Sequence, residues 1–212
     1  MPNAFAVRAK SGDEGEQERK RRIILTTAAN LFADRGFHAV RIDDIAKVLD
    51  VSKPTIYYYV ESKEDILFHI MSIELRDIER KLQKGVPQSS SAIEQLRFFL
   101  DVYTSHALSD FGVCLSLISD RVLSPESRRK VRRMLKRVED HMATIVERGA
   151  QDGTIVVHDK RLFVLAVFGA INWMPRWYSK EGRLTPSELS QAIFDIFRDH
   201  MLGSIRTTSK SR

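Results

Sequence analysis

The chain has 212 residues, of which 43% are hydrophobic and 29% charged, and it contains only 10 glycines and 6 prolines. This composition excludes collagen-like, low-complexity and wholly disordered proteins and indicates a folded protein with a core of ordinary size. The net charge of +6 favours an anionic partner, but most of the positive excess lies after residue 84. Bulk charge alone therefore does not identify that partner.

Several features of the sequence indicate the compartment in which the protein works. Cys114 is the single cysteine, so an intrachain disulfide is impossible and a reducing environment is expected. The longest apolar stretch, 162–174, is shorter than the ~20 residues of a membrane-spanning helix. Residues 1–17 are mostly small and polar and lack the apolar segment of a secretory signal. We therefore expect a flexible arm there, a cytoplasmic protein and no membrane partner.

Apolar residues recur at helical spacing from Glu18 onward and predict three helices followed by a long fourth. The first helix carries these residues on one face: Ile24, Ala28, Leu31 and Phe32. It stops at Gly36, and the second helix covers 42–49. Ser52 is a suitable N-cap for a very short third helix, and Ser62 opens the long helix that follows.

A cluster of Gly, Pro and Ser residues at 85–91 separates this part of the chain from the rest. Further helices are expected at 92–108, 111–122, 125–151, 159–178 and 186–202. No segment predicts a strand, and no internal repeat is visible. The expected fold class is all-α, with a small three-helix domain at 18–65, a larger helical domain at 66–205 and a flexible tail at 206–212.

The second and third helices, joined by a three-residue turn, predict a helix-turn-helix that places its second helix in the major groove of DNA. A generic three-helix cluster would show the same periodicity. The segment 52–63 favours DNA, because three consecutive tyrosines cannot all be buried on so short a helix. Exposed hydroxyls, a lysine and a helix N-terminus are donors that phosphates and base edges accept.

Residues 24–67 resemble the DNA-binding domain of the TetR family of bacterial transcription regulators. The matching residues are Ile24, Ala28, Leu31, Phe32, Gly36, Asp44, Ile45, Ala46, Val51, Ser52, Lys53, Thr55, Tyr57, Tyr58, Ser62, Lys63, Glu64 and Asp65. The resemblance implies that Lys53 and Thr55 reach bases of a near-palindromic, double-stranded operator. It implies phosphate contacts for Ser52, Tyr57, Tyr58 and Lys63. The expected DNA-binding residues are Arg41, Ser52, Lys53, Pro54, Thr55, Tyr57, Tyr58, Tyr59 and Lys63.

Several positions depart from the pattern of that family. Asp50 occupies a turn position usually held by Gly, and Asp adopts the left-handed conformation at a modest cost. Arg41 replaces a common Thr cap, so we expect a lost backbone cap and a gained contact with DNA. Pro54 and Tyr59 stand where Gly or Ala and His are common. The operator sequence therefore cannot be carried over from a relative.

The run 162–178 is apolar around nearly the whole helical circumference, so one face should meet its own domain and another a second surface. The final helix adds an apolar stripe: Leu189, Ile193, Ile196 and Phe197. TetR-like proteins dimerise through two such helices from each chain, so the resemblance implies a homodimer. The expected interface residues are Phe168, Gly169, Ile193 and Phe197. A purely intramolecular core is the alternative.

The segment 172–178, followed by 182–189, resembles a subset of TetR-like regulators that respond to acyl-CoA thioesters. Aromatic packing at a helix end is the plainer interpretation of the same residues. We expect no cofactor, and an acyl-CoA or similar lipophilic anion as the small-molecule effector. Helical phase and this resemblance predict a ligand pocket formed by Phe98, Phe99, Tyr103, Phe111, Leu115, Ile118, Asn172 and Arg176.

The helix at 128–137 interleaves basic and apolar residues. A solvated basic face is the simpler interpretation, and the alternative is that its arginines receive the phosphates of a coenzyme A moiety.

Enzymatic functions find little support. The six histidines show no HxxxH spacing, and no GxSxG elbow or phosphate-binding glycine loop is present, so we expect neither an enzyme nor a metal site. The sequence predicts a repressor that its effector releases from DNA. A multidrug-type repressor and a ligand-independent architectural DNA-binding protein remain alternatives, although the latter does not explain the long apolar-rich helical region.

Overall fold

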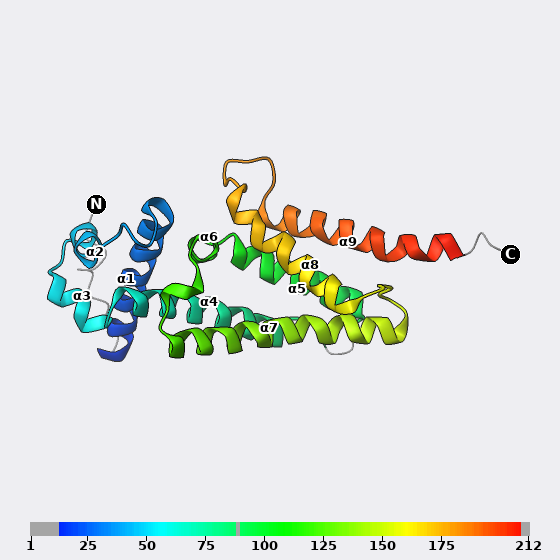
Figure 1. Ribbon diagram of the computed structural model, residues 1–212, viewed down its shortest axis with the longest axis horizontal. Helices are drawn as coiled ribbons and strands as arrows, with labels where there is room; N and C mark the ends of the chain where they lie inside the picture. The colour runs from blue at the N-terminus through cyan, green and yellow to red at the C-terminus, as the bar shows by residue number, and fades with distance from the viewer. Residues whose placement is uncertain (1–12, 88–89, 209–212) are drawn as a thin grey trace. The chain divides into compact units, whose positions relative to one another are not determined.

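A computed structural model describes residues 13–87 and 90–208, and every regular element in these two ranges is helical (Figure 1). The α-helices are α1 (Asp13–Arg35), α2 (Ile42–Leu49), α3 (Lys53–Tyr59), α4 (Lys63–Gly85), α5 (Ala92–Ala107), α6 (Asp110–Leu117), α7 (Pro125–Asp152), α8 (Lys160–Trp173) and α9 (Pro186–Thr208). Two short 3-10 helices, η1 (Asp120–Val122) and η2 (Met174–Arg176), complete the set. The predicted all-α fold is confirmed.

Some boundaries differ from those expected. α1 begins at Asp13, so residues 13–17 of the expected arm are helical, and α9 continues to Thr208. Residues 1–12 and 209–212 lie outside the described part of the chain. The helix expected at 111–122 is divided into α6 and η1. The one expected at 159–178 ends as α8 at Trp173 and continues only as η2, because Pro175 has no N–H to continue the α-helical ladder.

The helices form two compact units. The first unit contains the described residues up to Glu74 together with Asp110–Arg132. The second contains Leu75–Ser109 and the described residues from Arg133 onward. The first unit therefore includes α6, which packs against α1.

The core of the first unit comes from the apolar faces that the sequence predicts. Ile24 and Phe32 of α1, Ile45 of α2 and Ile56 of α3 are fully buried. Phe32 also meets the ring of Phe37 edge to face, with 5.1 Å between the ring centres. These contacts fix α2 and α3 against α1, so the outward face of α3 is set by its buried Ile56.

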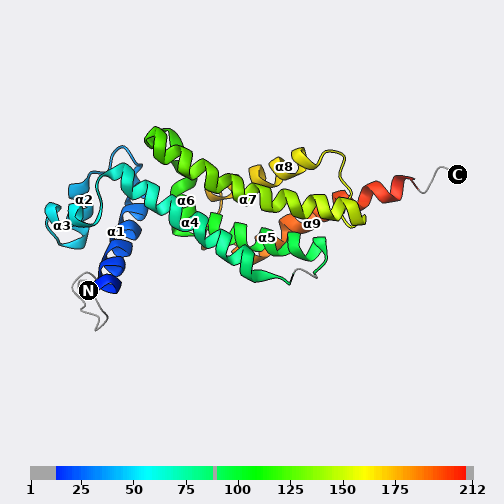
Figure 2. The same cartoon turned by 90° about the horizontal axis from the view of Figure 1, so that it is seen from below.

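In the second unit, α5 packs against α8 and α9 (Figures 1 and 2). Leu96 and Leu100 of α5 and Met142 of α7 are fully buried. The start of α5 is held by Ser91, whose hydroxyl accepts from the Glu94 N–H at 3.3 Å while the Glu94 carboxylate accepts from the Ser91 N–H at 2.8 Å. α9 begins with the predicted capping box of Thr185 and Glu188, in which the same two bonds measure 3.3 and 2.7 Å.

Candidate nucleic-acid interface and ligand cavities

The helix-turn-helix is set by its turn and its N-cap. Asp50 has φ 53° and ψ 48°, the left-handed conformation that the sequence predicts, and the adjacent Val51 N–H donates to the Ala46 carbonyl at 3.0 Å. Ser52 then caps α3, since its hydroxyl accepts from the Thr55 N–H at 3.3 Å. Pro54 lies in the first turn, where its missing N–H has no intrahelical partner to lose.

The start of α2 lacks a side-chain cap at Arg41, as the sequence predicts. The Asp44 carboxylate compensates in part, because it accepts from the Arg41 N–H at 2.7 Å. The Arg41 guanidinium is exposed and has no acceptor within hydrogen-bond distance among the described residues. It is therefore available to an anion in front of α2.

The tyrosines of α3 are partly exposed, as predicted. Tyr57 and Tyr58 are 47% and 69% exposed, whereas Tyr59 is half-buried and meets Tyr58 edge to face at 5.0 Å. The Tyr58 hydroxyl accepts a hydrogen bond from Gln17 Nε2 of α1 at 3.2 Å. Two phenol groups thus lie on the open face of the short helix.

Lys53 lies on the same open face and forms an ion pair that the sequence analysis missed. Its Nζ is 2.9 Å from Asp43 Oδ2 of α2, and this hydrogen bond raises the pKa of the lysine. Both side chains are exposed, so the pair contributes little to stability and is open to exchange for DNA. The sequence feature that could have predicted this ion pair is Asp43, an acidic residue in the first turn of α2, which packs against α3.

Lys63 has partners within the chain that the family resemblance did not imply, beside the phosphate contact that stays a prediction. Its Nζ donates to the carbonyl oxygens of Phe37 and Val40 at 2.8 and 2.9 Å and lies 4.4 Å from the centre of the Phe37 ring. Two of the three N–H donors of the ammonium are thereby used within the chain. Lys63 fastens the loop between α1 and α2 to the start of α4.

The residues expected to line one ligand pocket are distributed over both units. Phe111, Leu115 and Ile118 belong to α6 of the first unit and the residue that follows it, where Phe111 is buried and the other two are half-buried. Phe98, Phe99 and Tyr103 belong to α5 of the second unit. The single pocket stays a prediction, and its residues divide into two sets that belong to different units.

On α5, Phe99 and Tyr103 are core residues rather than pocket walls. Their rings stack at 5.9 Å, and Phe168 of α8 meets Tyr103 edge to face at 4.9 Å. The Tyr103 hydroxyl donates to Asn172 Oδ1 at 2.9 Å, and burial raises the pKa of Tyr103 to about 12. Arg176 does not join this pair, because its guanidinium lies 4.6 Å from the centre of the exposed Trp173 ring.

Phe98 is half-exposed and lines three cavities of the second unit. One, of about 480 Å³, lies among α4, α5 and α7 and includes Ile145, His141 and Arg148 in its lining. A second, of about 330 Å³, is bounded by basic residues of α4, and a third, of about 310 Å³, reaches the start of α9. Partial burial lowers the pKa of His141, whose ring lines the cavity of about 480 Å³.

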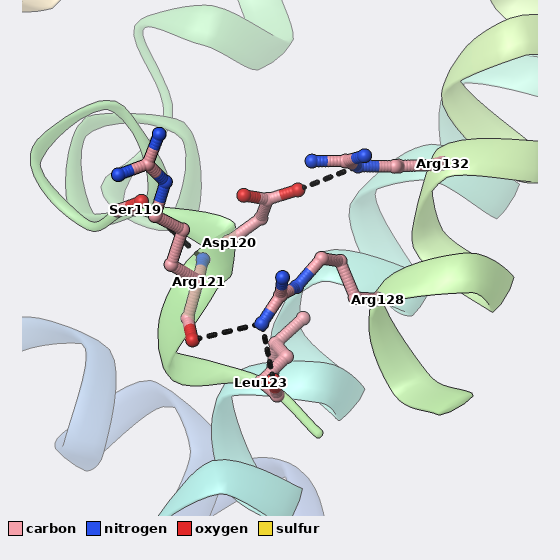
Figure 3. A network of polar contacts seen from close by, with 6 residues as sticks. All are labelled: Ser119, Asp120, Arg121, Leu123, Arg128 and Arg132. Atoms are coloured by element: carbon pink, nitrogen blue, oxygen red, sulfur yellow. Dashed lines mark hydrogen bonds and ion pairs between the residues drawn. The ribbon is translucent and has the colours of Figure 1, made fainter. Parts of the chain in front are cut away.

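Most basic groups of 128–137 already have partners within the chain. In the first unit, Arg128 donates to the carbonyl oxygens of Arg121 and Leu123 at 3.0 and 3.1 Å, and Arg132 is 2.9 Å from the Asp120 carboxylate (Figure 3). The remaining pairs are Lys130 with Glu126, Lys136 with Asp140, and Arg137 with Glu79. This pattern fits the interpretation of a solvated, ion-paired face.

α8 has a buried face and an exposed apolar face. The exposed side chains are Leu162, Leu165 and Trp173, at 63%, 54% and 59% exposure. Gly169 lies on the same face, and a Cβ atom there would contact nothing within 4 Å. Phe168, expected at the interface, is instead buried against Tyr103, because it precedes Gly169 by one residue and therefore lies on a different face of α8.

On α9, Ile196 is 64% exposed, whereas Ile193 and Phe197 are half-buried. The Phe197 ring meets Phe163 of α8 at 5.5 Å and so packs within its own unit. In the part of α9 whose side chains the structure describes, up to Arg198, Ile196 is the most exposed large apolar residue, and it belongs to the stripe that helical phase predicts.

Two family patterns match most of the chain. The family described as "Bacterial regulatory proteins, tetR family" matches residues 24–70, and the one described as "Tetracyclin repressor-like, C-terminal domain" matches residues 89–201. The chain belongs to the TetR family. It is thus a DNA-binding transcriptional regulator, and its family is not one of enzymes. In the described ranges, no group of three or more His, Cys, Asp or Glu is arranged to hold a metal ion, and no helix is long and apolar enough to span a membrane.

Similar proteins agree with this assignment. The TetR-family regulator PfmR from Thermus thermophilus is 30% identical, with a TM-score of 0.76 over 82% of this chain and 96% of that one. The "Fatty acid metabolism regulator protein" of Bacillus subtilis is 24% identical over 82% of this chain and 91% of its own length. AibR, solved with isovaleryl coenzyme A and operator DNA, shares the fold, with 24% identity and a TM-score of 0.75 over 84% of this chain and 98% of its own.

Proposed function

We propose that the protein is a homodimeric repressor that leaves a near-palindromic operator when an acyl-CoA thioester, or a similar lipophilic anion, binds its second unit. The observation that carries this proposal is the pair of cavities that Phe98 lines: Leu82, Val86 and Ile145 add apolar side chains to the mixed lining of one, and Arg80, Lys81 and Lys84 bound the other. A thioester of coenzyme A has the matching chemistry, because it joins an apolar chain to a phosphorylated nucleotide.

The names of similar proteins support the same chemical class. One similar regulator acts in fatty acid metabolism by its name, and AibR was solved with an acyl-CoA and operator DNA. These proteins share about a quarter of their residues with this chain, so the effector of this chain is inferred from its own cavities and charges together with those names.

The proposed operator contact uses the open face of α3. Lys53 and Thr55 read bases, while Ser52, Tyr57 and Tyr58 hold phosphates, and Arg41 adds a contact from the start of α2. In a dimer, two such helices meet successive major grooves about 34–36 Å apart, which is the reason for a near-palindromic site. To contact a base, Lys53 must first break its ion pair with Asp43, so this pair makes a small unfavourable contribution to DNA binding.

The proposed dimer joins α8 and α9 of one chain to the same helices of another. The outward apolar residues of α8 and the exposed Ile196 of α9 provide the surface, and Gly169 permits close approach of two helices.

The effector acts on DNA binding only if it binds the two states of the dimer with unequal affinity. A preference of about 2–3 kcal/mol for the DNA-free state changes DNA affinity by roughly 30- to 150-fold.

Thermal-shift measurements against a library of acyl-CoA thioesters, free fatty acids and neutral hydrophobic compounds test the effector class. A ligand that binds the folded state raises the melting temperature by mass action. We expect stabilisation by thioesters. Stabilisation by neutral compounds alone would replace the effector with a multidrug-type ligand, and DNA binding with no stabilising ligand would favour an architectural protein.

A further inference from the structure

The last turns of α4 place three cations around one cavity of the second unit. Arg80, Lys81 and Lys84 line it together with Phe98 and Asp101, and its volume is about 330 Å³. Asp101 of α5 is the one carboxylate in the lining, so positive charge exceeds negative charge there. A cavity of this kind attracts an anion, and the Phe98 ring offers an apolar surface to the rest of the ligand.

Two of these cations have no anionic partner in the part of the chain that the structure describes. Arg80 is paired with Asp77 at 2.7 Å. Lys81 and Lys84 are exposed, and no described carboxylate lies within ion-pair distance of either ammonium. This is the reverse of α7, where most basic groups of 128–137 are occupied by carboxylates or carbonyl oxygens.

Phe98 lines both this cationic cavity and the cavity of about 480 Å³. Its ring lies directly on the backbone of Gly85, since a Cβ atom at Gly85 would fall 1.9 Å from Phe98 Cε1. The ring is half-buried and lines both cavities, so the two cavities share this one side chain as a wall. A molecule with phosphates at one end and an apolar chain at the other can place its phosphates beside the cations of α4 and its chain against Phe98, Leu82 and Ile145.

We propose that Lys81 and Lys84, assisted by Arg80, bind the phosphates of the effector, and that its acyl chain passes Phe98 into the cavity lined by His141 and Ile145. This inference rests on the proposed function and assigns the phosphate site to α4 instead of the basic helix at 128–137. Lysine ammonium groups bind phosphate as point charges through charge-assisted hydrogen bonds. The shared chemistry is a phosphorylated nucleotide, so coenzyme A without an acyl group is bound as well, more weakly.

The test is a calorimetric titration of the full-length protein with a long-chain acyl-CoA, with coenzyme A and with the free fatty acid. The variant is Lys81→Gln with Lys84→Gln, and the matched control is Arg129→Gln with Arg133→Gln, which removes two exposed charges from α7. We expect the α4 variant to bind acyl-CoA and coenzyme A about tenfold more weakly and the free acid unchanged, because only phosphate contacts are lost. The control variant should bind all ligands as the wild type does.

Each other outcome is decisive. Wild-type affinity of the α4 variant for acyl-CoA overturns the site, and a loss confined to the α7 variant moves the phosphates to 128–137. If acyl-CoA binds the wild type and the α4 variant equally well and releases DNA from both, the α4 phosphate site is refuted and the proposed function is retained. If no thioester binds the wild type, both the proposed function and the α4 site are refuted. Circular dichroism of both variants verifies that each is folded.

Discussion

Replacing Lys63 with methionine tests whether this residue supports the fold or binds DNA. Methionine keeps most of the apolar stem and removes the ammonium that donates to the carbonyl oxygens of Phe37 and Val40. Hydrogen bonds to a charged group contribute about 1.5–3 kcal/mol each, and a cation over an aromatic ring adds about 0.5–1 kcal/mol. The lower ends of these ranges sum to about 3.5 kcal/mol for two hydrogen bonds and one ring contact. Since Lys63 is partly exposed, water replaces part of this, and we expect a loss of about 2–4 kcal/mol in the free energy of unfolding.

The assay is thermal and urea unfolding followed by circular dichroism, together with the salt dependence of DNA affinity. For a chain of this size, each kcal/mol shifts the melting temperature by about 2–4 °C, so a fall of about 4–16 °C is expected. Lys47→Met on α2 is the control, since Lys47 is exposed and its loss should change stability by less than about 0.5 kcal/mol. An unchanged melting temperature for Lys63→Met, with a salt slope reduced by about 1, would refute the structural role and restore the phosphate contact.

Three further predictions concern the operator, the dimer and a buried phenol. Lys53→Ala should weaken specific DNA binding by about 1–3 kcal/mol and relax base preference in a selection from random duplexes, whereas equal weakening on every sequence would make Lys53 a positioning residue. Gly169→Glu should give monomers in sedimentation at micromolar concentration, and a persistent dimer would exclude α8 from the interface. The pKa of Tyr103, raised by burial to about 12 from 10.0, predicts stability that is complete below pH 10 and lost as the pH rises toward 12. Tyr103→Phe should remove that loss, and an unchanged pH profile of unfolding in this variant would contradict the assignment.

The helices and their buried faces were predictable because each depends on local signals. The apolar spacing of α1 accounts for the burial of Ile24 and Phe32, and the caps at Ser52 and Thr185 depend on residues three positions away. Asp50 in the left-handed conformation follows from its place between two short helices, since Asp tolerates that conformation better than most residues.

Features that depend on tertiary partners were not predictable from spacing. Lys63 matches a family position, but its carbonyl partners lie 23 and 26 residues earlier and become visible only in the fold. Phe168 and Gly169 are neighbours in the sequence and lie on different faces of α8. An error of one residue in helical phase therefore assigns a core residue to the exposed face. The cations of 128–137 find acids on other elements, such as Asp120 and Glu79, which composition cannot pair with them.

The most direct test of the proposed regulation is a fluorescence-anisotropy titration of the protein on its selected operator duplex in the presence of acyl-CoA. The proposal predicts that a thioester releases the operator with roughly a 30- to 150-fold loss of affinity, while coenzyme A alone has a smaller effect. Release by free acids or neutral drugs, with no effect of any acyl-CoA at saturating concentration, would contradict the thioester effector and leave a regulator with a different hydrophobic ligand.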